Sequence, residues 1–325
     1  MDERCRQRNA ALASALQPLP GSTPYENRRR LNVGGAFEGM TLAEFLAAKH
    51  PHIDGCVWQR SAQAGRLEVD GRRVPELGRV VRAGNQIVHV IPGEVEPDVA
   101  TSLRFVHEDD QLVVLDKPAP LPVHPSGRFN KNTVVGLLAH AFDGWRVHPV
   151  HRLDADTTGV LVLAKDRVAA RHLGVQFEAR TVVKRYLAKV HGATSGRFRC
   201  TAPVGRRPNA LGKRSAGAGA PALTHFFTLR ADATTSVVAA WPRSGRTNQI
   251  RVHLAALGHP IVGDRAYGPD AQGEFQSGGA LCLHADALRL RHPADDRWVR
   301  FSASRPAWAR RSAATPQGGG SELLG

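Results

Sequence analysis

The spacing of apolar residues along the 325-residue chain predicts two folded segments. Between residues 41 and 64, apolar side chains recur three or four positions apart, which predicts two short helices. Two short strand-like runs follow at 66–69 and 86–91, and Asp70-Gly71 after the first run is typical of a tight turn. We therefore expect a small α+β domain over residues 37–95, followed by a linker centred on 92–97.

The second segment, residues 103–306, is longer and richer in strands. Runs 112–115 and 159–164 are apolar throughout, and runs 185–190 and 237–241 add two further strands. Helices are predicted at 169–179, with Leu173 and Phe177 facing inward, and at 248–257, where Gly258 and Pro260 end the helix. This order predicts an α+β domain built on a mixed, mostly antiparallel sheet.

The two ends of the chain lack such periodicity. Residues 1–36 combine several prolines with the run Arg28-Arg29-Arg30, which favours an irregular basic arm. Residues 307–325 hold three consecutive glycines and few apolar side chains, so we expect a disordered tail.

Charge points to the partner. Lys and Arg number 44 against 29 Asp and Glu, which gives a formal net charge of +15 and a sequence pI near 10.7. Such an excess favours a polyanionic partner, although a general enrichment in arginine would give the same count. The four cysteines are far apart, and neither a signal peptide nor a long apolar run is present, so we expect a cytoplasmic protein without disulfides or a zinc ribbon.

The most informative segment is 151–159 (HRLDADTTG), a charged turn that leads into an apolar strand. Such a position places Asp154 at the rim of a sheet, where rigid structure holds it but a cleft can expose it. From these residues alone, Asp154 either caps the turn or acts in catalysis.

Motifs along about 200 residues resemble those of the RluA family of pseudouridine synthases. The matching segments are 116–118 (DKP) with 121–125 (LPVHP), 151–159, 184–188 (KRYLA), 222–224 (ALT), 244–254 (SGRTNQIRVHL), 258–264 (GHPIVGD), Tyr267-Gly268, 283–285 (LHA) and His292-Pro293. The resemblance implies an enzyme that flips a uridine out of structured RNA and isomerises it to pseudouridine without a metal or cofactor. We expect it to act as a monomer.

The resemblance assigns three catalytic positions: Asp154 as the carboxylate, Tyr186 as the active-site tyrosine and Arg251 as the partner of Asp154. An ionised carboxylate can attack the uracil ring or the sugar, or take a proton from the sugar, and the sequence leaves these routes open. Tyr186 offers a flat face for the base and a hydroxyl for proton transfer, unless it is only a core residue.

RNA contacts are expected from basic side chains in both segments. In the larger one, Arg152 resembles the family residue that fills the space left by the flipped base, although a phosphate contact is the alternative, and Arg246 lies in the GRT motif. The remaining candidates there are Arg206, Arg207, Lys213 and Arg214, in a glycine-rich loop that either follows the RNA backbone or is a solvated insertion. The small domain resembles the alpha-L RNA-binding domain named after small-subunit ribosomal protein four, which implies Arg60, Arg66 and Arg72 as RNA contacts, with Lys49 and Arg73 as further candidates. The alternative is a small domain without a ligand.

The chain departs from the family motifs at a few positions. Pro120 replaces a glycine after the DKP motif, Asn248 replaces a histidine, Thr158 stands where serine is frequent, and residues 41–43 (TLA) replace an Arg-Leu-Asp in the small domain. We expect Asn248 to change either the hydrogen bonding around the site or the choice of target, without removing Asp154, Tyr186 or Arg251.

Two other functions compete with this interpretation. A non-catalytic RNA-binding protein of the same fold predicts that the catalytic residues are missing, whereas all three are present. A metal-dependent hydrolase is suggested by the 15 histidines, including His151, His253, His259 and His284, but their spacing matches no familiar ligand motif. Because an alpha-L domain is more common among the ribosomal members of the family, rRNA is the favoured substrate over tRNA.

Overall fold

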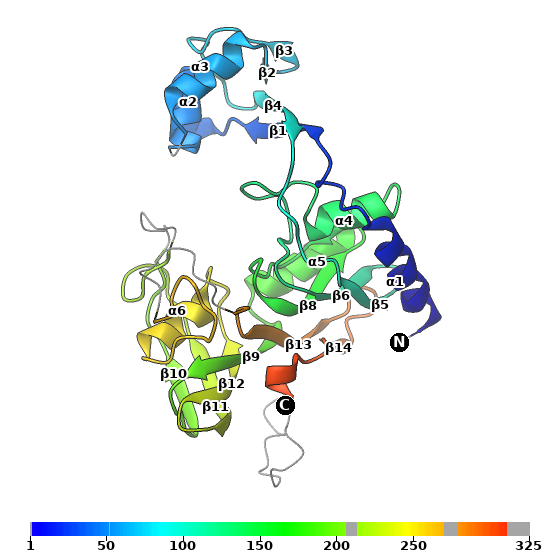
Figure 1. The fold of residues 1–325 in the computed structure, drawn as a ribbon, viewed down its shortest axis with the longest axis vertical. Coiled ribbons are helices and arrows are strands. Elements are labelled where there is room, and N and C mark those ends of the chain that lie inside the picture. The colour runs from blue at the N-terminus through cyan, green and yellow to red at the C-terminus, as the bar shows by residue number, and fades with distance from the viewer. Residues whose placement is uncertain (1, 52, 206–212, 270–278, 311–325) are drawn as a thin grey trace. The chain divides into compact units, whose positions relative to one another are not determined.

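The chain forms two compact units in the computed structural model, which describes residues 2–51, 53–205, 213–269 and 279–310. The smaller unit comprises Leu19–Asp98 with Arg128–Lys131, and the remaining described residues form the larger unit (Figure 1). The smaller unit is thus an insertion in the sequence of the larger one, between its first helix and its first strand.

The smaller unit is a four-stranded antiparallel sheet with two helices. Its elements are β1 (Tyr25–Asn32), η1 (Gly35–Phe37), α2 (Leu42–Lys49), α3 (Gly55–Gln63), β2 (Leu67–Val69), β3 (Arg72–Arg73) and β4 (Gln86–Glu94), in the sheet order β1-β4-β2-β3. Thr41 begins α2 through a reciprocal capping box with Glu44, which explains why a threonine suits this position. Asp70 and Gly71 both have positive φ, as the predicted tight turn requires.

The prediction of an irregular arm at 1–36 was wrong. Residues 3–15 form α1 (Glu3–Ala15), capped by Asp2 and part of the larger unit, and β1 pairs with β4. The apolar pattern did not predict α1 because many of the contacts that stabilise this helix are polar. Arg8 donates to the buried Glu108 and lies over the rings of Phe142 and Trp145.

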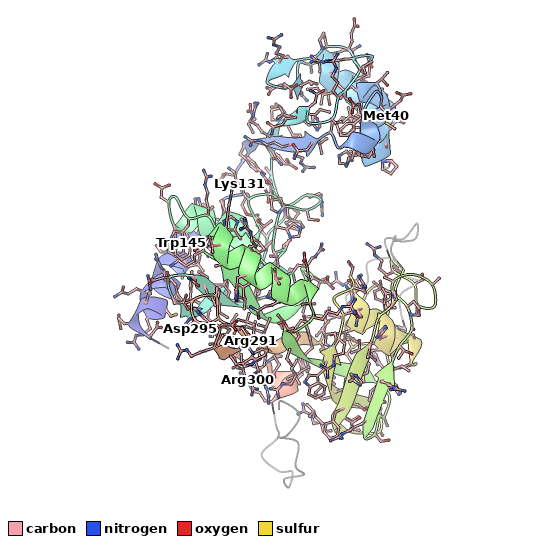
Figure 2. The ribbon with its side chains drawn as sticks, turned by 180° about the vertical axis from the view of Figure 1, so that it is seen from behind. Met40, Lys131, Trp145, Arg291, Asp295 and Arg300 are labelled. Carbon is pink, nitrogen blue, oxygen red and sulfur yellow. The ribbon has the colours of Figure 1, made fainter. Side chains whose placement is uncertain are left out.

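Strand β1 escaped prediction for a similar reason. It is a polar strand, and charged pairs replace apolar packing: Arg29 pairs with Glu94 on the adjacent β4, and Arg28 reaches Glu68 on β2 beyond it. The Nζ of Lys131 also lies 3.8 Å from the centre of the Tyr25 ring (Figure 2). The expected linker likewise begins too early, because β4 continues through Pro92 to Glu94.

The larger unit is an α+β domain around a mixed sheet, as predicted. Its strands are β5 (Arg104–Glu108), β6 (Leu112–Lys117), β7 (His148–Pro149), β8 (Thr158–Ala164), β9 (Val183–His191), β10 (Arg197–Cys200), β11 (Thr224–Ala231), β12 (Thr235–Pro242), β13 (Leu283–Arg291) and β14 (Trp298–Ser302). The main path runs β10-β11-β12-β9-β13-β8-β6-β5, with β14 beside β13 and β7 beside β8. Strands β8 and β13 are parallel, and the other pairings recorded for this sheet are antiparallel.

Three helices besides α1 cover this sheet: α4 (Val134–Ala141), α5 (Arg167–Glu178) and α6 (Gln249–Ala256). Helix α5 contacts β8 and β13, whereas α6 contacts β11 and β12 (Figure 1). Every residue of β6 is buried, which explains its continuous apolar run. In α5, Leu173 is buried as predicted, and Phe177 is half-buried and stacks on His151. None of the described helices is long and apolar enough to cross a membrane.

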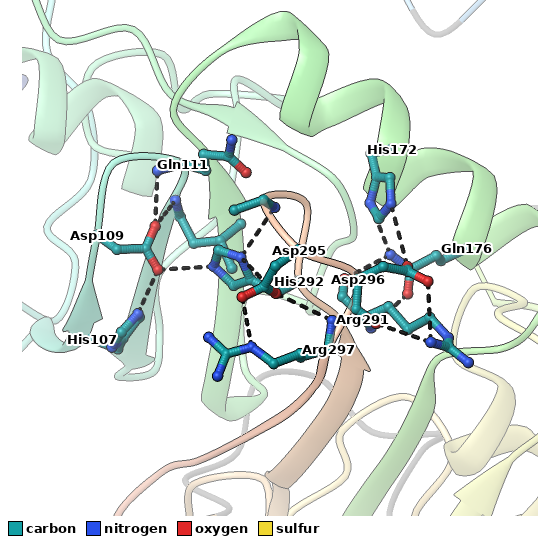
Figure 3. A network of polar contacts seen from close by, with 12 residues as sticks. His107, Asp109, Gln111, His172, Gln176, Arg291, His292, Asp295, Asp296 and Arg297 are labelled. Atoms are coloured by element: carbon teal, nitrogen blue, oxygen red, sulfur yellow. Dashed lines mark hydrogen bonds and ion pairs between the residues drawn. The ribbon is translucent and has the colours of Figure 1, made fainter.

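A polar network fixes the turn between β13 and β14 (Figure 3). The carboxylate of Asp109 contacts the Nε2 atoms of His107 and His292 at 2.7 and 3.0 Å. On the other side of the turn, Gln176 of α5 bonds to the backbone of Arg291 in both directions. These contacts hold β13 in the position from which it supports the site described below.

The last described residues are folded, so the predicted disorder is wrong for 307–310. Ala309, in η2 (Ala307–Ala309), packs against Leu187 and Ala239, and the Arg230 side chain donates to the carbonyls of Trp308 and Arg310. Residues 311–325 of the predicted tail lie outside the described residues.

Candidate active site

A cavity of about 440 Å³ lies beside the start of β9, the end of β12, the start of α6 and the segment before β8. This volume is in the range of small-molecule sites. Asp154, Tyr186 and Arg251 all line it, so the fold brings together the three catalytic residues predicted from the sequence.

Asp154 faces this cavity as an open carboxylate. Its side chain is 26% exposed, and from the described part of the chain it accepts no hydrogen bond, its ion pair with Arg251 being its recorded contact. The backbone carbonyl of Asp154, not its side chain, closes the turn by accepting from the Thr157 amide at 3.0 Å. The alternative role of Asp154 as a turn cap is therefore not supported.

Lys117 stabilises the loop that carries Asp154 through hydrogen bonds. This side chain is fully buried, and its Nζ donates to the carbonyls of Pro118, Leu121 and Ala155 at 2.9, 2.7 and 3.0 Å. Burial lowers the pKa of Lys117 to about 7, although the charges of Asp156 and Asp154 oppose the shift. One of these carbonyls belongs to Ala155, the residue directly after Asp154. Lys117 therefore helps to fix the backbone from which the Asp154 carboxylate reaches the cavity.

The contacts of Arg251 differ in part from the expectation. Its guanidinium makes a two-pronged bond to Asp264, at 2.8 Å from Nε and 2.7 Å from Nη2, whereas Nη1 is 3.6 Å from Asp154. The Asp264 side chain is fully buried, and that of Arg251 is 11% exposed. Arg251 is thus oriented by Asp264 and approaches Asp154 with its remaining nitrogen, so it is the partner of both carboxylates.

Asn248, which stands where the family motif has a histidine, extends this arrangement. Its Oδ1 accepts from Arg251 Nη1 at 3.3 Å, and its Nδ2 donates to the hydroxyl of Tyr267 at 3.2 Å. The residue has a φ of 57°, a left-handed conformation that asparagine adopts more readily than most side chains. The Tyr267 hydroxyl also accepts from the Arg214 amide at 2.8 Å, which connects the site to the glycine-rich loop.

Tyr186 stands on β9 with Lys184 two residues before it, and both side chains line the cavity. Burial raises the pKa of Tyr186, and the negative charge of Asp154 raises it further. Burial also lowers the pKa of Lys184. Tyr186 is therefore a neutral phenol at physiological pH, suited to packing on a base and to donating a hydrogen bond.

The four histidines singled out in the sequence have separate structural contacts. His151 accepts from the Val162 amide at 2.9 Å, and burial lowers its pKa to about 3, so it is neutral. His253 bonds to Thr224 and Ala202, His259 to the His191 carbonyl and His284 to Thr158. Among the described residues, no group of three or more histidine, cysteine and carboxylate side chains is arranged to hold a metal ion.

The predicted RNA contacts are distributed over the two units. Arg152 and Arg246 line the cavity, the first exposed and the second half-buried. Lys213 and Arg214 are half-buried in the loop beside Tyr267, while Arg206 and Arg207 lie outside the described residues. Arg60, Arg66 and Arg72 are exposed on the smaller unit.

The sequence had not assigned roles to Lys117, Asp264, Arg180 or Arg243. Lys117 and Asp264 stand in the DKP and GHPIVGD motifs, so the signal was present, but their contacts depend on the fold. Arg180 and Arg243 also line the cavity, and no motif marked them.

Comparisons with known proteins agree with this site. A profile described as RNA pseudouridylate synthase matches residues 111–256. A Nitrosomonas europaea protein named ribosomal large subunit pseudouridine synthase D is 35% identical over 84% of this chain and 83% of its own length. The mitochondrial tRNA pseudouridine(32) synthase of Saccharomyces cerevisiae is 32% identical over 78% of this chain and 56% of its own length.

Solved structures show the same relationship. The human RNA pseudouridylate synthase domain containing 1 superimposes with a TM-score of 0.52 at 29% identity, covering 66% of this chain and 86% of its own. The fold and the sequence both match RNA pseudouridine synthases, and Asp154, Tyr186 and Arg251 are all present in this chain. The chain belongs to the RNA pseudouridylate synthase family, the isomerases that convert uridine in RNA to pseudouridine.

Proposed function

We propose that Asp154 is the catalytic carboxylate, that Tyr186 contacts the uracil and that Arg251 orients Asp154. The observation that carries this proposal is the open Asp154 carboxylate, which faces a cavity beside one guanidinium and one neutral phenol. Two charged groups close to it are committed to structural contacts, Lys117 to three carbonyls and Asp264 to Arg251.

The reaction exchanges one glycosidic bond for another. The bond between uracil N1 and ribose C1′ breaks, the base turns, and C5 bonds to C1′, so C5 loses its proton and N1 gains one. Asp154 serves this exchange as a nucleophile towards the ring or the sugar, or as the base that takes a proton from the sugar. The Tyr186 phenol packs on the base and can donate to a carbonyl oxygen, which fixes the base while it is detached.

The target base must leave its helix before it can enter the cavity, which costs a few kcal/mol. Arg152 is placed to enter the vacated space because it is exposed and precedes Asp154 by two residues at the rim of the cavity. Arg246, Lys213 and Arg214 are proposed to bind phosphates around this opening, together with Arg206 and Arg207.

We infer that the substrate is rRNA and that the smaller unit binds its backbone through Arg60, Arg66 and Arg72. The longer of the two named alignments, with the ribosomal enzyme of Nitrosomonas europaea, supports rRNA over tRNA. A cytoplasmic monomer is the proposed form of the protein.

Mapping pseudouridines in total RNA from a strain that lacks the gene tests this proposal. We expect at least one pseudouridine in large-subunit rRNA to disappear and to return when the native gene is restored. A site that disappears from tRNA alone contradicts the choice of rRNA, and an unchanged map contradicts the proposed activity on cellular RNA.

A further inference from the structure

A second cavity, of about 350 Å³, adjoins the catalytic one. It lies beside β9, β11 and β12, near the end of α5. Five residues line both cavities: Arg180, Val182, Lys184, Pro242 and Arg243. A ligand in the catalytic cavity therefore has a continuation of the same space in which its next group can lie.

The lining of the second cavity is strongly basic. It includes four arginines, Lys184 and His225, and it contains neither aspartate nor glutamate. In the described part of the chain, no carboxylate forms an ion pair with Arg180, Arg197 or Arg243. Several uncompensated cations around one space favour an anion there, and the phosphate that joins two nucleotides is the anion that RNA supplies.

Flat apolar surface completes the site. Trp241 on β12 lies opposite His225 on β11, and Phe227, two residues further along β11, faces the same side of the sheet. All three are only half-buried. Aromatic side chains next to cations bind unpaired nucleotides, because every base presents a flat face for stacking and every nucleotide carries a phosphate.

Arg180 gives a separate indication that the junction is functional. It follows α5 with a φ of 59°, in the left-handed region where glycine is the usual residue after a helix. An arginine there strains the backbone that a glycine would relax. Its side chain lines both cavities, which offers a reason for an arginine at this position.

We propose that the second cavity binds the nucleotide next to the target uridine, with its base on Trp241 and Phe227 and the connecting phosphate between Arg180 and Arg243. This inference builds on the proposed function and adds a second nucleotide subsite to it. Because stacking does not distinguish the bases, the subsite requires an unpaired neighbour of any sequence and selects uridines in loops or at helix ends.

Three small probes separate the contributions: uridine, a uridine joined through a phosphate to an abasic ribose, and the dinucleotide UpU. Affinities are measured by calorimetry for the full-length protein. The abasic probe is made in two versions, with the abasic ribose on the 5′ side or on the 3′ side of the uridine. We expect the added base to strengthen binding by roughly 5-fold to 150-fold on one of the two sides, from about 1–3 kcal/mol for a stacked base.

Matched variants assign each contribution to its side chain. Trp241→Leu should abolish the gain from the base and keep the gain from the phosphate. Arg180→Gly, which suits the backbone at this position, should reduce the gain from the phosphate. Arg199→Gln is the control, because Arg199 lies on β10 two residues from Arg197 but outside the cavity lining, and it should behave as the native protein.

Equal binding of uridine and UpU by the native protein overturns the proposal, as does an undiminished base effect in Trp241→Leu. If Arg180→Gly weakens the binding of a polyglutamate peptide but leaves the affinity for UpU unchanged, the cavity binds an acidic protein segment and the proposal is wrong. A failed proposed function appears differently, as an unchanged pseudouridine map whatever the dinucleotide affinities are.

Discussion

Replacing Arg251 with Met tests the arrangement of Asp264, Arg251 and Asp154. From the described part of the chain, the fully buried Asp264 carboxylate then keeps its bonds from the Ala266 and Tyr267 amides, at 2.9 and 3.0 Å. Removing one partner of a buried ion pair costs about 3–5 kcal/mol. For a domain of this size, that destabilisation lowers Tm by roughly 6–20 °C, at about 2–4 °C per kcal/mol.

Loss of activity in this single variant is therefore ambiguous, because the fold suffers as well. Adding Asp264→Asn removes the unpaired charge, so the double variant should be more stable than the sum of the two single changes predicts. Its activity should stay low, because Asp154 still lacks the guanidinium that approaches it to 3.6 Å. Urea unfolding and single-turnover pseudouridine formation measure the two effects on the same proteins. Additive stabilities would refute the Arg251–Asp264 pairing, and a double variant with native activity would show that Arg251 does not orient Asp154.

Three further predictions concern the support of the site and the smaller unit. Because the pKa of Lys117 falls from 10.5 to about 7 on folding, the unfolded chain holds this proton where the folded chain releases it. The free energy of unfolding should therefore rise between about pH 7 and pH 10, by at most about 1.4 kcal/mol per pH unit. Urea unfolding of Lys117→Met should lack this rise. An identical pH dependence in both proteins would contradict the prediction. Gly159→Ala should destabilise by about 1–3 kcal/mol or more in thermal unfolding, since its φ is 114° and a Cβ would lie 2.2 Å from the Ala285 carbonyl oxygen; Gly174→Ala on α5, where a Cβ meets nothing within 4 Å, is the control, and equal stabilities would argue against this close approach. Changing Arg60, Arg66 and Arg72 together to Gln should reduce the slope of log affinity against log salt by roughly 0.7–0.9 for each phosphate that the variant no longer binds, and an unchanged slope would show that the smaller unit does not bind RNA through them.

Most of the elements that the sequence predicted owe their stability to apolar burial, although α4 and β13 are also largely buried and were not predicted. Strands β6 and β8 and helices α2, α3, α5 and α6 appear close to their expected positions because their patterns report burial on one or both faces. Helix α1 and strand β1 did not, because long-range ion pairs such as Arg8 with Glu108 stabilise them and leave no periodic signal.

The same limit applies to the site. The motifs singled out Asp154, Tyr186 and Arg251, which line one cavity in the structure. They did not indicate that the Asp264 carboxylate accepts from two nitrogens of Arg251. Nor did they mark Arg180, because its proposed role rests on its positive φ and on a cavity formed by segments far apart in sequence. Contacts between residues far apart in sequence have no local pattern from which they can be predicted.

The central claim is that the Asp154 carboxylate carries out the isomerisation, and Asp154→Asn tests it most directly. The change preserves size and removes the charge, so RNA affinity should remain near that of the native protein. Because C5 loses its hydrogen when pseudouridine forms, RNA labelled with tritium at uridine C5 releases the label only on turnover. We predict label release by the native protein on rRNA and none above background by Asp154→Asn at equal RNA occupancy, whereas release by the variant at the native rate would contradict the account.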